Sequence, residues 1–259
     1  MRENTTKAKL RAGETVMGCF VRYPEATLAE MLGYYGWDYL IFDGEHSSIT
    51  PRDCENLARA CELQNITPIV RVTTNHPATI LRYMDSGMQG AQIPMINTQA
   101  EAEAAVRSVK YHPLGNRGLA GVRPANFGQV QPFSFKDYTA QANAETMVIA
   151  QVETAAAVDA LPEIIKVPNI DVIFIGPTDL SQSLGFPGEI NHPTVQATFD
   201  RIIEIVKPTG ITIGTLVPNL ATALQWQERG AKYLMITMEA LLGPACRGFL
   251  QAARTTEQK

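Results

Sequence analysis

Eight short apolar runs, rich in valine and isoleucine, alternate with longer segments of helical period along this 259-residue chain. Such alternation is typical of βα units that build a parallel sheet. Several runs are continuously apolar, as expected of strands covered by helices on one face and by a packed barrel interior on the other. We predict strands over residues 15–21, 39–44, 67–72, 90–95, 146–153, 170–176, 211–217 and 232–238.

The number of units favours a closed barrel. Measured between one central residue of each run, the steps are 24, 29, 22, 57, 25, 40 and 22 residues, so five steps fit single βα units and two carry insertions. A (β/α)8 barrel fills about 250 residues, and we predict an α/β fold with one barrel domain over residues 1–259. A doubly wound sheet is the alternative, but VRYPEAT follows the first run where a Gly-rich phosphate-binding turn would stand. The larger insertion covers about residues 112–144.

The composition argues against several other classes of protein. Apolar residues make up 45% and charged residues 19% of the chain. This composition provides enough apolar side chains for a buried core and argues against a disordered chain. The formal charge of -4 and the lack of a basic run disfavour nucleic acid as a partner. No apolar stretch is long enough for a membrane helix, and the polar start does not read as a signal peptide, so we expect a cytoplasmic protein without a membrane partner. The cysteines have no metal-binding spacing and read as small buried hydrophobic residues: Cys19, Cys54, Cys61 and Cys246.

Polar residues gather where several predicted strands end. In a barrel the chemistry lies at the carboxyl ends of the strands, so polar residues there indicate a site. Gln151 and Glu153 are two apart on a strand and share its inward face if Val152 packs outward. We expect one rim to collect Asp43, Glu45, His46, Arg71, Asp85, Gln92, Gln151, Glu153, Thr178 and Asp179.

Two carboxylates are the expected metal ligands. Glu153 and Asp179 come from consecutive strands without thiols or imidazoles beside them. Hard oxygen ligands of this kind suit Mg²⁺ or Mn²⁺ better than zinc, with water and substrate oxygens completing the shell. The alternative is that either carboxylate forms a structural salt bridge with Arg71.

An acid–base pair and an anion clamp are expected at the same rim. Asp43 and His46 are three residues apart, and a carboxylate bonded to the imidazole would raise its basicity, as a general base near neutral pH requires. Asp85 could serve the same end. Arg71, inside an apolar strand, is costly to bury without an anionic partner, so it either binds a carboxylate or enolate oxygen or forms a structural ion pair.

The absence of two kinds of residue limits the classes of reaction that the predicted site could catalyse. A Schiff-base aldolase needs a lysine inside the barrel, and the lysines fall on helix-like segments, in the insertion or at the entering end of the last strand. No Gly-rich phosphate cup follows the last two strands, which disfavours a sugar-phosphate substrate. A metal, a base and an anion clamp together fit proton transfer or carbon–carbon chemistry next to a carbonyl.

Five motifs resemble one enzyme family. FDGEHS (42–47), IVRV (69–72), MDSGMQGAQIPM (84–95), QVET (151–154) and FIGPTDLSQSLG (174–185) are similar, in order, to motifs of the class II pyruvate aldolases of the HpcH/HpaI family. This family includes 4-hydroxy-2-oxoheptanedioate aldolase and 2-dehydro-3-deoxyglucarate aldolase, and the similarity spans about residues 13–245. The resemblance implies reversible cleavage of 4-hydroxy-2-oxo acids to pyruvate and an aldehyde through a pyruvate enolate.

The resemblance also implies roles for individual residues. His46 would be the general base, acting through water, with Asp43 and Asp85 supporting it, and Arg71 would stabilise the enolate oxygen. The cofactor would be Mg²⁺, Mn²⁺ or Co²⁺. The remaining expected contacts are Glu153 and Asp179 to the metal, and Gln151, Thr178, Asp179, Arg71 and Leu216 to the substrate. The family further implies a homo-oligomer, a hexamer built as a trimer of dimers, in which the last helix, around 240–254, packs on a neighbour.

Other readings remain open at this point. An oxaloacetate decarboxylase, or a lyase of carboxylic acids or CoA esters, would use the same metal and enolate, and a barrel that only binds a 2-oxo acid belongs to a different class. The insertion reads RGLAGVRPANFG (117–128), and the last strand continues as TMEALLG, where family members commonly show Asp-x-Gly-Leu-Leu. Both departures concern the aldehyde, and Arg123 is either a ligand for a distal carboxylate or an exposed loop residue.

Overall fold

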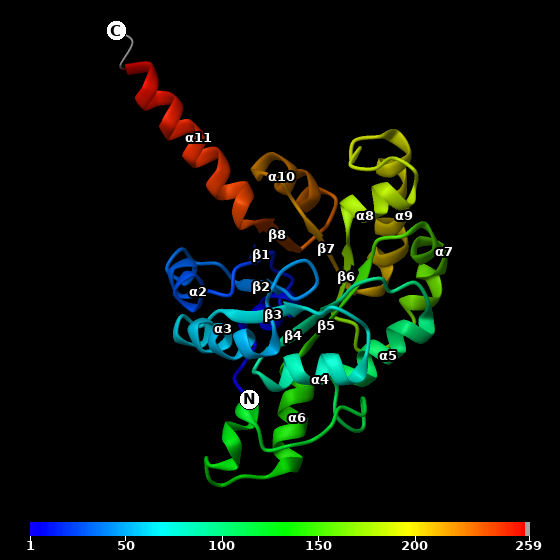
Figure 1. Ribbon diagram of the computed structural model, residues 1–259. Coiled ribbons are helices and arrows are strands. Elements are labelled where there is room, and N and C mark those ends of the chain that lie inside the picture. Colours follow the sequence, from blue (N-terminus) through cyan, green and yellow to red (C-terminus); the bar gives the residue numbers. More distant parts are fainter. Residues whose placement is uncertain (257–259) are drawn as a thin grey trace.

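The computed structural model describes residues 1–256, in which eight parallel strands close into a barrel (Figure 1). Each strand pairs with the next in chain order, and β8 pairs with β1. The predicted (β/α)8 fold is confirmed and the doubly wound alternative is wrong. Every observed strand falls inside a predicted one: β1 (Val16–Val21), β2 (Tyr39–Asp43), β3 (Thr67–Arg71), β4 (Gly90–Ile93), β5 (Met147–Val152), β6 (Val172–Ile175), β7 (Thr212–Leu216) and β8 (Tyr233–Thr237).

Helices connect the strands and cover the outside of the barrel (Figure 1). Capping residues at their starts explain several boundaries: Thr50 and Asp53 form a capping box before α3, and the Asn219 side chain accepts a hydrogen bond at the start of α10. The helices are α1 (Thr5–Arg11), α2 (Ala26–Gly33), α3 (Pro51–Leu63), α4 (Pro77–Asp85), α5 (Gln99–Val109), η1 (Arg123–Gly128), α6 (Phe135–Glu145), α7 (Ala155–Ile164), α8 (Pro177–Ser183), α9 (Pro193–Val206), η2 (Lys207–Thr209), α10 (Leu220–Glu228) and α11 (Met238–Thr256).

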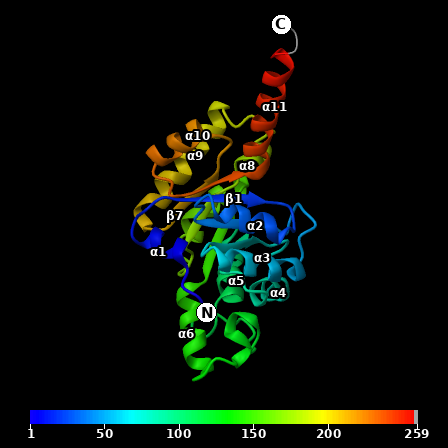
Figure 2. The ribbon, with the colours of Figure 1, turned by 90° about the vertical axis from the view of Figure 1, so that its left-hand side faces the viewer.

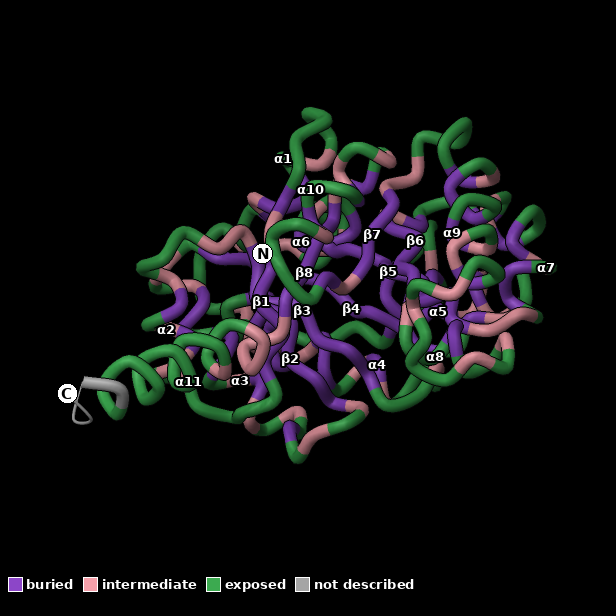
Figure 3. The backbone as a smooth tube through the Cα atoms, turned by 90° about the horizontal axis from the view of Figure 1, so that it is seen from above, coloured by how far each residue is buried: buried purple, intermediate pink, exposed green. Residues whose placement is uncertain are grey.

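The alternation of side chains along each strand gives the barrel two cores, and most residues of the strands are buried (Figure 3). On β2, Leu40 and Phe42 pack outward against helices, whereas Tyr39 and Ile41 point into the barrel. The Tyr39 and Tyr233 rings stack inside the barrel, with centroids 4.3 Å apart. This interior filling closes the barrel below the rim where the strands end.

The larger insertion lies at the amino end of the barrel. Both η1 and α6 extend below the strands, at the opposite end from α8 and the start of α11 (Figures 1 and 2). Tyr111, Ala125, Tyr138 and Ala142 form a small separate core there. In this chain the insertion is therefore remote from the rim at which the carboxyl ends of the strands meet.

The last helix, α11, stands away from the barrel (Figures 1 and 2). It leaves Cys246 exposed, so the expectation that all four cysteines are buried is wrong for this one and confirmed for Cys19, Cys54 and Cys61. The sequence pattern could not distinguish a helix that packs on its own barrel from one that projects. Among residues 1–256, no helix is both long and apolar enough to cross a membrane.

Candidate active site

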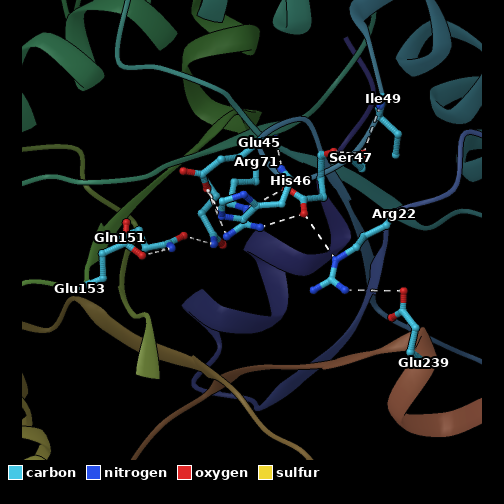
Figure 4. A network of polar contacts seen from close by, with 11 residues as sticks. Arg22, Glu45, His46, Ser47, Ile49, Arg71, Gln151, Glu153 and Glu239 are labelled. Carbon is cyan, nitrogen blue, oxygen red and sulfur yellow. Dashed lines mark hydrogen bonds and ion pairs between the residues drawn. The ribbon is translucent and has the colours of Figure 1, made fainter. Parts of the chain in front are cut away.

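A cavity of about 240 Å³ opens at the carboxyl rim of the barrel, and we call it the rim cavity. It unites most of the expected site residues from six of the eight strands and their following loops. Its lining comprises Phe20, Arg22, His46, Arg71, Gln92, Gln151, Phe174, Gly176, Pro177, Thr178, Asp179, Leu216, Met235 and Thr237. Figure 4 shows the polar network around it, with Glu153 and Gln151 on one side and Arg22 on the other.

A fixed ion pair lies at the centre of this network. Asp43 and Arg71 are partners in the register of β2 and β3, and Arg71 donates from Nε to Oδ1 at 2.9 Å and from Nη2 to Oδ2 at 2.8 Å. Burial alone would raise the pKa of Asp43, but Arg71 and two backbone N–H donors outweigh it and lower the pKa. The guanidinium also lies 4.9 Å from the centre of the Phe20 ring. Arg71 therefore has an anionic partner, as its burial requires, and still lines the cavity.

Glu45 is the second partner of this guanidinium. Its Oε2 lies 3.2 Å from Nη1 of Arg71. Burial is the main cause that raises the pKa of Glu45, and the negative charges of Asp43 and Asp179 raise it further. The nearby Arg71 and His46 lower the pKa, but they do not cancel the increase. The position of Glu45 after the second strand predicts that it lies at this rim. Its contact with Arg71 depends on the conformation of the loop, which the sequence does not predict.

The expected side-chain pair between Asp43 and His46 is not formed. Asp43 Oδ1 instead accepts hydrogen bonds from the backbone N–H groups of Glu45 and His46, at 3.1 and 3.2 Å. The His46 ring is 62% exposed, and its Nε2 lies 3.8 Å from Oε2 of Glu45. The prediction failed because Arg71 occupies both oxygens of Asp43, and Glu45 is the carboxylate nearest to the imidazole.

Asp85 does not reach the rim in this chain, so the prediction that it converges there is wrong. It ends α4, which runs down from the carboxyl end of β3, and it precedes β4, so it lies at the amino end of the barrel. Its Oδ1 accepts from Nη2 of the buried Arg117 at 2.6 Å. A residue just before a strand lies at the opposite end from one just after a strand, and this distinction separates Asp85 from the other candidates.

A chain of amides holds Glu153. Gln92 donates from Nε2 to Gln151 Oε1 at 2.5 Å, and Gln151 donates from its own Nε2 to Glu153 Oε2. The backbone N–H of Met95 donates to Glu153 Oε1 at 2.8 Å, and Met95 adopts a left-handed φ of 55°. Each carboxylate oxygen of Glu153 thus has one donor, and each keeps a further lone pair.

Gly176 allows this carboxylate to approach the backbone. A Cβ atom on Gly176 would lie 2.7 Å from Oε2 and 2.9 Å from Cβ of Glu153. Because real Cβ atoms do not come this close to another atom, any larger residue would push Glu153 aside. The glycine before α8 is therefore part of how the chain positions Glu153.

The carboxylates on this side fit a divalent cation. Burial is the main cause that raises the pKa of Glu153, and the negative charges of Asp179 and Glu45 raise it further. The hydrogen bonds that Glu153 accepts lower the pKa, but by less. A bound cation would relieve this repulsion, and two carboxylates supplemented by water and substrate are a usual site for Mg²⁺. Among residues 1–256 no group of three or more His, Cys, Asp and Glu side chains forms a larger cage. Glu153 and Asp179 are thus the residues that would hold a metal.

Arg123 lies far from this site. Its guanidinium pairs with both oxygens of Glu62, at 2.9 and 2.6 Å, and lines a separate cavity with Met1 and Arg2. The possibility that Arg123 binds a distal carboxylate of a substrate in its own barrel is therefore wrong for this chain. No pattern in the sequence predicts that Glu62, at the end of α3, contacts the insertion.

A family model described as "HpcH/HpaI aldolase/citrate lyase" matches residues 16–241. The chain belongs to the HpcH/HpaI aldolase family. It is 34% identical over 238 residues to a hydroxypyruvate/pyruvate aldolase of Roseobacter denitrificans, covering 91% of both chains. It is 37% identical over 237 residues to a 5-keto-4-deoxy-D-glucarate aldolase of Salmonella paratyphi C, covering 90% of both.

Solved structures agree with this assignment. The crystal structure of an HpcH/HpaI aldolase/citrate lyase family protein from Burkholderia cenocepacia superposes with a TM-score of 0.91 at 34% identity, over 97% of this chain and 99% of the other. The predicted family is confirmed, and membership identifies the chain as a carbon–carbon lyase.

Proposed function

We propose that the protein catalyses the divalent-metal-dependent, reversible aldol cleavage of a 4-hydroxy-2-oxo acid to pyruvate and an aldehyde. The observation that supports the proposal is the rim cavity, whose lining includes Asp179, Arg71 and His46. Glu153 lies beside this lining and accepts a hydrogen bond from the lining residue Gln151. Family membership supports the same class of reaction.

The 2-oxo acid end of the substrate would lie beside Glu153 and Asp179. A divalent cation, Mg²⁺, Mn²⁺ or Co²⁺, would supply Lewis acidity that polarises the ketone when it is bound there. Gln151, Leu216 and the backbone at Thr178 line the same part of the cavity and would contact the pyruvate half. The amide chain that fixes Glu153 would keep this end of the site rigid.

Arg71 would stabilise the enolate oxygen. Nη1 and Nη2 each carry two N–H groups, and contacts with Asp43 and Glu45 engage one on each. The second N–H of each nitrogen remains for a developing negative charge at the cavity wall, and a guanidinium held in advance needs little reorganisation. Asp43 would act as the positioning residue for Arg71 rather than for His46.

His46 would move the proton. In the cleavage direction its imidazole, through a water molecule, would accept the proton of the 4-hydroxyl group as the C3–C4 bond breaks and the aldehyde leaves. The bonding electrons remain on C3 as the pyruvate enolate, and a proton added at C3 completes pyruvate. The exposed ring, free of a side-chain bond to Asp43, can exchange its proton with solvent.

Chelation tests the proposal. Cleavage of a 4-hydroxy-2-oxo acid, followed as pyruvate release, should stop in excess EDTA and return on addition of Mg²⁺, Mn²⁺ or Co²⁺. Full activity in EDTA, or a covalent adduct trapped by borohydride, would contradict it. Release of pyruvate from oxaloacetate alone, without cleavage of any aldol substrate, would favour a decarboxylase instead.

A homo-oligomer is a further part of the proposal. The projecting helix α11 exposes Leu241, Leu242, Phe249 and Leu250, and burying such a row on another copy would be favourable. We propose that α11 packs on a neighbouring copy within a hexamer, a trimer of dimers.

A further inference from the structure

Two arginines line the rim cavity, and the second of them, Arg22, has no role in the reaction described above. Arg22 directly follows β1, two residues after Phe20, which points into the barrel. Because side chains alternate along a strand, Arg22 lies on the same face as Phe20 and one layer nearer to the opening. The register pairs Phe20 with Thr237, so Arg22 lies above the β1–β8 wall.

The ionic contacts of Arg22 are loose. Its Nε lies 3.6 Å from Asp43 Oδ2, and its Nη1 lies 3.7 Å from Glu239 Oε1. Neither distance is that of a hydrogen bond. Both oxygens of Asp43 already accept from Arg71, and Glu239 Oε1 accepts from Tyr23 at 3.0 Å. With a side chain 42% exposed, Arg22 can turn its N–H groups to a ligand.

Arg22 also lies at the far end of the cavity from the carboxylates. Figure 4 shows Glu153 and Gln151 on one side, Arg22 on the other, and Arg71 with His46 between them. In the proposed reaction the 2-oxo acid lies beside Glu153, and the bond that breaks lies next to His46. The aldehyde half of the substrate must then extend away from Glu153, toward Arg22.

We propose that Arg22 binds a carboxylate carried by the aldehyde half of the substrate, so that the preferred acceptor is an anionic aldehyde. This inference rests on the proposed function and adds the chemical class of the second substrate. A guanidinium can grip both oxygens of a carboxylate with parallel N–H donors, which a neutral aldehyde cannot use. The alternative role for Arg22 is purely structural, as a counter-charge for Glu239 and Asp43.

The two roles differ in how substitution affects charged and neutral acceptors. Condensation with pyruvate is measured for aldehydes OHC–(CH2)n–COO⁻ with n from 0 to 3 and for unsubstituted alkanals of equal carbon number. Arg22→Ala should lower kcat/KM for the best carboxylated aldehyde by about 10- to 100-fold, the usual worth of a charge-assisted contact, and change that of the alkanals less than about threefold. Equal losses for both, no loss, or a wild-type preference for alkanals would overturn the proposal.

Three variants complete the experiment. Arg22→Lys keeps the charge without the planar fork and should fall between wild type and Arg22→Ala. Arg201→Ala removes an exposed arginine that pairs with Asp159 outside the cavity, and it should change neither class of acceptor. The double variant Arg22→Ala, Glu239→Gln should remain impaired for carboxylated aldehydes, whereas recovery to wild-type rates would show that Arg22 only neutralises Glu239.

Deuterium exchange separates this proposal from the function on which it rests. Exchange of the pyruvate methyl protons in D2O requires the enolate but no aldehyde. Arg22→Ala should exchange at the wild-type rate while losing its preference for anionic acceptors. Absence of exchange in the wild-type enzyme would overturn the aldolase function itself, and a slowed exchange in Arg22→Ala would overturn the assignment of Arg22 to the aldehyde.

Discussion

The guanidinium of Arg71 is held in a fixed orientation in the candidate active site. Two carboxylates and an aromatic ring surround its guanidinium, so its orientation is set before any substrate arrives. Removing one partner of such a buried pair leaves the other uncompensated, which generally costs more than the pair contributes. The same principle makes His46, which is exposed and has no buried partner, the catalytic candidate best suited to substitution.

Replacing His46 should affect catalysis far more than folding. His46→Ala should lower kcat for aldol cleavage by about 10²- to 10⁴-fold, the usual contribution of a general base, and leave the unfolding midpoint nearly unchanged. His76→Ala is a matched control, because His76 is also exposed but does not line the rim cavity. Its imidazole accepts a hydrogen bond from the Ala78 N–H at the start of α4. A change below about threefold in His46→Ala would remove this residue from the role.

Gly176 provides a test of how Glu153 is positioned. The added Cβ of Gly176→Ala would displace the Glu153 carboxylate, so the apparent dissociation constant for Mn²⁺, measured by calorimetry, should rise about 10- to 100-fold. Gly121→Ala in the insertion is the control, since the nearest neighbouring atom to a Cβ there would be 3.9 Å away. Unchanged Mn²⁺ affinity in Gly176→Ala would remove Glu153 from the proposed metal site.

At the scale of elements, the sequence predicted the strands well because their order and apolar pattern are local properties. Alternation also predicts that Gln151, on β5, and Glu153, directly after β5, point to the same side, and the hydrogen bond between their side chains agrees with this. What could not be predicted depends on contacts between distant segments. Asp43 turned to Arg71 across the β2–β3 register, and the left-handed φ of Met95, which aims its N–H at Glu153, has no signature in the sequence.

The interior of the barrel makes a glycine on β1 necessary. A Cβ on Gly18 would lie 2.1 Å from the Tyr39 ring, which stacks on Tyr233 and donates a hydrogen bond from its hydroxyl to Leu234 O. Gly18→Ala should therefore lower the free energy of unfolding by about 3 kcal/mol in urea denaturation. Gly118→Ala, where the new Cβ makes ordinary contacts, should change it by less than 1 kcal/mol, and equal effects would contradict this account.

A buried lysine below the barrel should make stability depend on pH. Lys110 donates from Nζ to the carbonyls of Asn143 and Thr146, and burial, aided by the nearby Lys7 charge, lowers the pKa of Lys110 to about 7. The unfolded chain, with the ordinary value of 10.5, binds more protons above pH 7, so stability should rise with pH there.

The expected gain from this lysine is about 1 to 2 kcal/mol between pH 7 and 8.5, and below pH 7 its contribution should be constant. Urea unfolding of wild type and Lys110→Met across this range measures it, since the variant lacks the titrating group. Parallel pH dependence in the two proteins would show that the Lys110 amine does not titrate in this window.

At the scale of the whole molecule, the insertion and α11 lie outside the barrel, at opposite ends of it (Figure 1). Neither contributes a residue to the rim cavity of this chain as described by residues 1–256. The exposed apolar side chains of α11 form the surface that the proposed hexamer would bury.

Association through α11 has a direct test. Phe249, which is 75% exposed, should be buried against a neighbour, so Phe249→Glu should reduce the mass measured by light scattering at micromolar concentration. Leu63→Glu introduces the same charge at a comparably exposed apolar position on α3 and should leave the mass unchanged. A wild-type monomer would contradict the proposed hexamer.

The central claim is that the rim cavity generates a pyruvate enolate with the help of a divalent metal. Proton NMR of pyruvate in D2O tests it most directly, because deuterium enters the methyl group only through the enolate. The protein with Mg²⁺ or Mn²⁺ should remove the methyl signal at a rate proportional to its concentration, and excess EDTA should abolish the exchange. No exchange with any of Mg²⁺, Mn²⁺ and Co²⁺, or undiminished exchange in EDTA, would contradict the account.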